Sequence, residues 1–187
     1  MAFKSSLLMT AALGAMLLPT LPAQDVASIP FSRGVYFHGD SGWIGLTGNM
    51  LMPMVESGAA DFFSVGGKRA IVEIPGARAT VQTTNARPTL YVRGFSASTG
   101  IFLVKETQKQ EYREIHMPVS HNFREFVHFR DKDLRAIEVQ SVGNGLVSIK
   151  PMADLAAGEY AIVSAVDSND RFLKIGYDFG VIGGPRK

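Results

Sequence analysis

The sequence contains one string that is typical of a catalytic serine, Gly39-Asp40-Ser41-Gly42. A serine acts as a nucleophile when a histidine accepts its proton and a buried aspartate orients that histidine. Only one histidine, His38, precedes Ser41 in the chain. Glycine and aspartate are also the residues that favour a tight hairpin turn. We therefore expect Ser41 at an exposed hairpin tip, and a hydrolase that uses Ser41 is the alternative.

Three of the four histidines, His116, His121 and His128, lie close together among acidic residues. Histidine and carboxylate side chains are common zinc ligands, so these three are the candidate metal ligands. Their spacing fits neither one strand face nor one helix face, whereas zinc ligands on one element usually lie three to five residues apart. We expect no metal and no cofactor, and a site would require a loop that brings the three side chains together.

Four glutamates could supply the carboxylate pair of a glycoside hydrolase: Glu106, Glu111, Glu114 and Glu159. Such a pair must lie about 5 Å or about 7–9 Å apart across a cleft, and no spacing in the sequence defines one. We expect most of these glutamates to pair across strands with neighbouring cations, which are Lys105, Lys109, Arg113 and Arg124. The mixed charge of residues 105–113 predicts a solvated face or an edge strand that is protected against self-pairing.

Aromatic side chains gather around the first predicted hairpin, where Tyr36 and Trp43 are the candidate binding residues. Exposed rings on a β-sandwich would suit a sugar or an apolar peptide. Aromatic side chains of a hairpin are more often buried against the adjacent sheet, and we expect burial here.

Strands must position these residues, because the hydrophobic periodicity indicates strands along nearly the whole chain and no long helix. Two hairpins are expected in the first half, one formed by residues 34–38 and 43–46 and the other by residues 69–74 and 77–83. The intervening residues 47–67 indicate a looser segment.

Seven further strands are expected in the second half, namely 89–93, 101–106, 111–117, 134–142, 145–150, 159–166 and 172–181. Sequences suited to turns separate them, such as Gly143-Asn144-Gly145. The spacing leaves no room for crossover helices, so the sheets should be mainly antiparallel. The expected fold is all-β, an antiparallel immunoglobulin-like β-sandwich preceded by an N-terminal hairpin region. Residues 122–133 fit either a short helix or a short strand.

The start of the chain is typical of a secretory signal peptide. Lys4 supplies a positive charge, residues 7–18 form an apolar run, and Pro22-Ala23 ends it with a small residue. The run is too short to span a bilayer, which takes about 20 apolar residues, and a buried N-terminal helix is the alternative. The expected organisation has three parts, which are the signal peptide at 1–23, the hairpin region at 24–87 and the sandwich core at 88–187. The last two parts are expected to form one compact unit.

Charge and cysteine content exclude several classes of function. The formal net charge is +2, without a run of basic residues, so nucleic acid is not an expected partner. The chain has no cysteine, which excludes disulfides, thiolate metal sites, a cysteine nucleophile and the lipid anchor of a bacterial lipoprotein. With no further long apolar stretch, we expect no stable membrane anchor. The absence of disulfides in an exported chain favours a bacterial envelope or extracellular protein.

The second half carries Arg87-Pro88-Thr89-Leu90-Tyr91-Val92, and Leu155-Ala156-Ala157-Gly158-Glu159-Tyr160-Ala161 followed by Tyr177-Asp178-Phe179-Gly180-Val181. Together with Phe102-Leu103-Val104-Lys105 and Arg113-Glu114-Ile115, these segments resemble an uncharacterised family of exported bacterial β-sandwich proteins. That family more usually has proline at the position of Ala157. The resemblance implies the fold and export, and it implies no activity and no functional residues.

These observations predict an exported, non-enzymatic binding or interaction module of the bacterial cell envelope, periplasmic or extracellular. Its expected partner is an envelope or extracellular protein or a glycan, recognised by an edge strand or by surface loops. One alternative is a carbohydrate-binding accessory domain that uses Tyr36 and Trp43. The other is a hydrolase that uses Ser41 or a carboxylate pair.

Overall fold

The computed structural model describes residues 26–39, 42–51, 54–56, 69–95, 100–118, 129–164 and 175–183. These residues form strands and one short 3-10 turn, η1 (Val26–Ser28). The strands pair antiparallel except for β6 with β15, which confirms the prediction of an all-β, mainly antiparallel fold. None of the described helical structure has the length and apolar character that crossing a bilayer requires. The predicted signal peptide lies outside the described residues.

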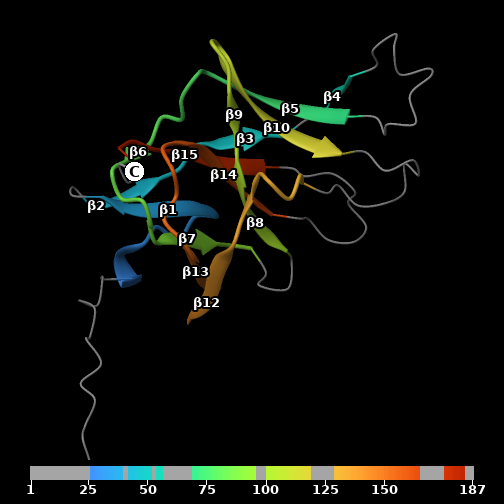
Figure 1. Ribbon diagram of the computed structural model, residues 1–187. Coiled ribbons are helices and arrows are strands. Elements are labelled where there is room, and N and C mark those ends of the chain that lie inside the picture. The colour runs from blue at the N-terminus through green and yellow to red at the C-terminus, as the bar shows by residue number, and fades with distance from the viewer. Residues whose placement is uncertain are drawn as a thin grey trace, which may run out of the picture.

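The strands form three sheets, and the first has five strands (Figure 1). Its order is β12 (Ile137–Gly143), β13 (Leu146–Pro151), β7 (Leu90–Arg93), β1 (Gly34–Gly39) and β2 (Gly42–Gly45). The turn that joins β12 to β13 has the residues Gly143, Asn144 and Gly145 at φ values of 101°, 52° and 69°. These left-handed conformations favour glycine and asparagine, which explains why the turn was predictable.

The second sheet has six strands, and β15 occupies a branch point in it. Its order is β11 (Leu134–Arg135), β8 (Ile101–Lys105), β14 (Gly158–Ser164), β15 (Ile175–Val181) and β3 (Gly48–Met50). The sixth strand, β6 (Gln82–Thr83), pairs with the last residues of β15, whereas β3 pairs with its first residues. The third sheet has four strands, in the order β4 (Met54–Glu56), β5 (Arg69–Pro75), β10 (Tyr112–Pro118) and β9 (Thr107–Gln108).

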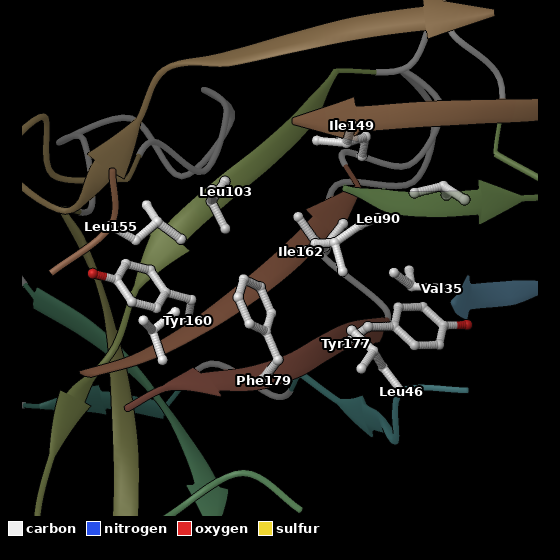
Figure 2. Packing of buried hydrophobic residues seen from close by; sticks show 12 residues of the cluster. Val35, Leu46, Leu90, Leu103, Ile149, Leu155, Tyr160, Ile162, Tyr177 and Phe179 are labelled. Atoms are coloured by element: carbon white, nitrogen blue, oxygen red, sulfur yellow. The ribbon is translucent and has the colours of Figure 1, made fainter. Parts of the chain in front are cut away.

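The six-stranded sheet is the middle layer, because its two faces bury side chains in two different cores. Tyr160 and Ile162 of β14 face the five-stranded sheet, in a cluster with Leu90 and Ile149. Figure 2 shows these side chains pointing into one shared interior. The alternate residues of β14, which include Val163, face the four-stranded sheet instead. The immunoglobulin-like arrangement of two packed sheets is therefore not confirmed, since the described strands stack in three layers (Figure 1).

Strands from residues 24–87 and 88–187 pair with one another in all three sheets. β1 pairs with β7 in the five-stranded sheet, β5 pairs with β10 in the four-stranded sheet, and β3 pairs with β15 in the six-stranded sheet.

Two sequence predictions in the first half were wrong. The segment 47–67 contains two described strands, β3 and β4, rather than loose structure alone. Residues 77–83 do not fold back on β5 as a hairpin, because the chain leaves the four-stranded sheet at Gly76 and β6 joins the six-stranded sheet. The predicted helix or strand at 122–133 lies outside the described residues except for residues 129–133.

Candidate functional site

A group of charged side chains is buried between the six-stranded and four-stranded sheets. Arg113, near the start of β10, is 2% exposed. Its Nη2 donates a hydrogen bond of 2.5 Å to Oδ2 of Asp178 on β15. Its Nε lies 2.8 Å from Oε2 of Glu106, which follows β8, although that contact lacks hydrogen-bond geometry. One guanidinium thus joins the two sheets.

A third carboxylate, Glu159 at the start of β14, belongs to the same group. Its Oε2 accepts the backbone N–H of Ala79 at 2.9 Å and the side-chain amide of Gln82 at 3.2 Å. Gly180 makes room for this amide, because a Cβ at that position would overlap it. We call Glu106, Arg113, Glu159 and Asp178 the Arg113 cluster. Ala79, in the segment between β5 and β6, and Gln82, the first residue of β6, therefore both hold Glu159 at one end of the cluster.

The Arg113 cluster combines three carboxyl groups with one guanidinium, and each side chain is at most 4% exposed. Burial raises the pKa of Glu106 to about 8, against the opposing effect of Arg113 and with the support of the charges on Asp178 and Glu159. Burial also raises the pKa of Asp178, although Arg113 and the amide of Asn49, 2.8 Å from Oδ1, oppose that shift. Glu106 therefore keeps its proton at neutral pH, which reduces the excess of negative charge.

The hydrogen bonding of the Arg113 cluster is incomplete. Among the described residues, both carboxyl oxygens of Glu106 lack a hydrogen-bond partner, and so do Nε and Nη1 of Arg113. Burying polar atoms without hydrogen-bond partners lowers the stability of the folded protein. The ion pairs of Arg113 with Glu106 and Asp178 must offset this loss where the two sheets meet.

The Arg113 cluster does not offer the carboxylate pair that a glycoside hydrolase needs. Glu106 and Glu159 are each 4% exposed, so a sugar chain has no access to them in this structure. The expected cross-strand pairing is confirmed for Glu106 with Arg113, and for Glu114 with Lys109 at 3.4 Å. Of the two alternatives predicted for residues 105–113, the edge strand is present as β9, whereas a solvated face does not hold for Glu106 and Arg113, which are buried.

The candidate metal ligands are only partly described. Nε2 of His116 lies 3.0 Å from Oε2 of Glu114. Burial lowers the pKa of His116, and the nearby Arg130 lowers it further, against the effect of Glu114. His121 and His128 lie outside the described residues, as does Ser41. Within the part of the chain that the structure describes, no three His, Cys, Asp or Glu side chains are placed to hold a metal ion.

The candidate binding residues Tyr36 and Trp43 lie on the outer face of the five-stranded sheet. Tyr36 is 6% exposed, and its hydroxyl donates to the carbonyl oxygen of Ser32 at 2.8 Å. Trp43 is partly buried: its Nε1 donates to Oγ of Ser28 at 2.8 Å, and its ring meets Tyr91 edge-to-face. Tyr36 is thus buried and Trp43 partly buried, as expected, but on the outer face of their own sheet rather than against a second sheet, and Tyr36 presents no open ring face to a sugar.

An open sheet edge is the second candidate site, and the sequence did not single it out. β12 is the outermost strand of the five-stranded sheet, and its residues from Glu138 to Gly143 are all exposed. Val139 and Val142 are 44% and 41% exposed. The strand is seven residues long and carries a single charge, on Glu138. A long, weakly charged edge is the kind of edge that accepts another strand.

Hydrogen bonding on one side of β12 determines which backbone groups point to the other side. The N–H of Met152 donates to the carbonyl oxygen of Ala136 at 2.9 Å, just before the first paired residues of the two strands. Because hydrogen-bonded pairs alternate along an antiparallel ladder, residues 138 and 140 face β13. The N–H and C=O groups of Ile137, Val139 and Ser141 therefore point away from the sheet. Among the described strands, none pairs with this edge.

Comparison of the chain with protein-family models, with curated proteins and with solved structures finds no match. The resemblance of the second half to exported β-sandwich proteins therefore stays a prediction.

Proposed function

We propose that this protein is an exported, non-enzymatic interaction module of the bacterial cell envelope that binds a protein partner by strand addition at β12. The observation that carries the proposal is the row of outward backbone groups on Ile137, Val139 and Ser141. A partner strand that lies along this edge gains main-chain hydrogen bonds, and the exposed side chain of Val139 adds an apolar contact. The predicted signal peptide supports export.

The Arg113 cluster supports the non-enzymatic part of the proposal. Its three carboxyl groups are buried, and those of Glu159 and Asp178 accept hydrogen bonds from backbone and side-chain donors, as expected for groups that hold two sheets together. The carbohydrate-binding alternative has less support, because Tyr36 is buried and the ring of Trp43 packs edge-to-face against Tyr91. The proposed site is therefore the backbone of an edge strand rather than a ring face or a carboxylate pair.

Cross-linking in intact cells tests this function. A photo-reactive amino acid at position 139 should give a defined cross-linked protein, whereas the same group at Glu73, an exposed residue of β5, should not. Ile137→Pro removes one outward N–H without removing a hydrogen bond to β13, so it should lower the yield at position 139 severalfold. Ile137→Thr keeps the N–H and serves as the matched control. Equal products from positions 139 and 73, or a yield unaffected by Ile137→Pro, would contradict the proposal.

A further inference from the structure

We propose that the strand which β12 accepts is β12 of a second copy of this chain, paired antiparallel about a two-fold axis at Val139. The inference rests on the proposed function, because it uses the same edge and names its partner. The resulting dimer would join two five-stranded sheets into one continuous sheet. Three features of β12 support this dimer: the register of its outward residues, the position of its charge, and the two residues at which its regular unpaired edge begins and ends.

The register of β12 is suited to pairing with itself. The outward residues Ile137, Val139 and Ser141 are symmetric about Val139. A two-fold axis at Val139 places Val139 opposite its own counterpart and Ile137 opposite Ser141 of the second copy. In an antiparallel ladder, residues opposite each other in this orientation exchange both N–H···O=C bonds. Each outward N–H and C=O of the three residues would therefore gain a partner, as an isologous interface requires.

The charge on β12 selects this axis over its neighbours. An axis at Glu138 would set two carboxylates directly opposite each other, about 4.5 Å apart between Cα atoms, which is destabilising. An axis at Val139 instead places Glu138 opposite Gln140 of the second copy, so no like charges face each other. Within its own sheet, Glu138 lies opposite Lys150 of β13.

The limits of the open edge select the same axis. The register of β12 against β13 shifts between Ser141 and Gly143, and such a bulge ends regular pairing. At the other end, β11 already belongs to the six-stranded sheet, so Ile137 is the first residue of β12 that is free to pair outward. Val139 is the middle of the regular edge that remains. An axis at Gln140 would push the paired residues into the bulge.

Two other edges of the described sheets, formed by β9 and β2, are less suited to self-pairing. β9 has only two residues, and Lys109 and Glu111 follow it closely. β2, at the far edge of the five-stranded sheet, begins at Gly42 and ends at Gly45. Short strands, charges and glycines weaken an edge as a template for pairing, and in β12 such features are limited to Glu138 and the bulge with Gly143 at its end.

Single cysteine variants of the purified full chain test the two-fold axis, because the natural chain has no cysteine. In the proposed dimer the two Cα atoms of residue 139 are about 5.5 Å apart, within the range that a disulfide spans. The two residues at position 140 are diagonal neighbours, about 7–8 Å apart, which is too far. Under mild oxidation, Val139→Cys should form a disulfide-linked dimer at least tenfold faster than Gln140→Cys. Equal rates for the two variants would overturn the inference.

The mass of the protein in solution gives a second, cysteine-free test. Light scattering should show a dimer for the natural chain and for Val139→Thr. Val139→Lys places two ammonium groups on the axis and should give a folded monomer, with folding checked by circular dichroism. A monomeric natural chain would overturn the inference. If the natural chain is monomeric but a photo-reactive group at position 139 cross-links to a different envelope protein, strand addition at β12 holds with another partner. If the natural chain is monomeric and position 139 gives no cross-linked protein, both proposals fail.

Discussion

The two faces of the six-stranded sheet are both buried, yet they are held in different ways. The face toward the five-stranded sheet is apolar along its length, with Tyr160 and Phe179 stacked at 5.8 Å between ring centroids. The face toward the four-stranded sheet is apolar around Val163 and Ala161 but ends in the Arg113 cluster. Stability on the first face follows from buried area, whereas on the second it depends also on how charges are paired.

Because of this difference, the stability of the interface between the six-stranded and four-stranded sheets depends on the charge pairing in the Arg113 cluster. Removing two charges from water costs several kcal/mol per ion, and their attraction offsets this only when both partners are present and well placed. Arg113 is shared between the carboxyl groups of Glu106 and Asp178, so its loss affects both at once. The apolar interface between the six-stranded and five-stranded sheets has, among its described residues, no side chain whose loss would leave several buried charged groups unpaired.

Replacing the guanidinium should have the largest effect. Arg113→Met leaves the buried carboxyl groups of Glu106 and Asp178 without their guanidinium partner, and should lower the free energy of unfolding at neutral pH by about 3–5 kcal/mol. Urea denaturation measures this change. Lys109→Met is the control on the same hairpin: the Lys109 side chain is 43% exposed and its Nζ lies 3.4 Å from Oε2 of Glu114, so its loss should cost under about 1 kcal/mol. Equal costs for the two variants would contradict the assigned role of Arg113.

The contribution of Glu106 to stability should fall as pH rises from about 4.5 to about 8, because burial raises the pKa of Glu106 from 4.5 to about 8. Below that range both folded and unfolded chains hold the proton. Within it the folded protein keeps a proton that the unfolded chain releases, so Glu106 contributes a loss of up to about 1.4 kcal/mol per pH unit. The raised pKa of Asp178 acts in the same direction.

Glu106→Gln isolates this contribution. The variant cannot ionise at position 106, so its stability relative to the natural chain should increase steadily between pH 5 and pH 8. The comparison at each pH cancels His116, whose lowered pKa acts in the opposite direction near its own titration. Chemical denaturation at several pH values provides the measurement. A stability difference that stays constant with pH would show that Glu106 does not hold its proton in the folded protein.

The same contrast explains what the sequence could predict. The strands were predictable because alternation is local, as in β10 (Tyr112–Pro118), where Arg113, Ile115 and Met117 share the buried face. That alternation already marks Arg113 as an inward residue. Its partner Asp178 lies 65 residues away, and no local pattern connects the two.

The three-layer stacking was not predictable for a related reason. In β14 the residues from Glu159 to Val163 are all buried, so the strand has no polar face to indicate which side meets another sheet. The open edge at β12 also follows from tertiary structure, because only the sheet order shows that this strand has no outer neighbour. Local periodicity therefore predicts the individual strands. The stacking of the sheets and the identity of the edge strands depend on pairing between residues far apart in the sequence.

The smallest predicted effect belongs to the apolar face. Ile162→Val removes one methylene group from a side chain that is 2% exposed, and should lower the free energy of unfolding by about 0.5–1.5 kcal/mol. This cost should be the same at pH 5 and at pH 8, because burial raises the pKa of Tyr160 and of Tyr177 above 10, which keeps both hydroxyl groups of this cluster neutral. Urea denaturation at the two pH values measures it beside Glu106→Gln. If the cost of Ile162→Val changed with pH as much as that of Glu106→Gln, the two faces would be coupled through the middle sheet, and the division between an apolar and a proton-linked interface would fail.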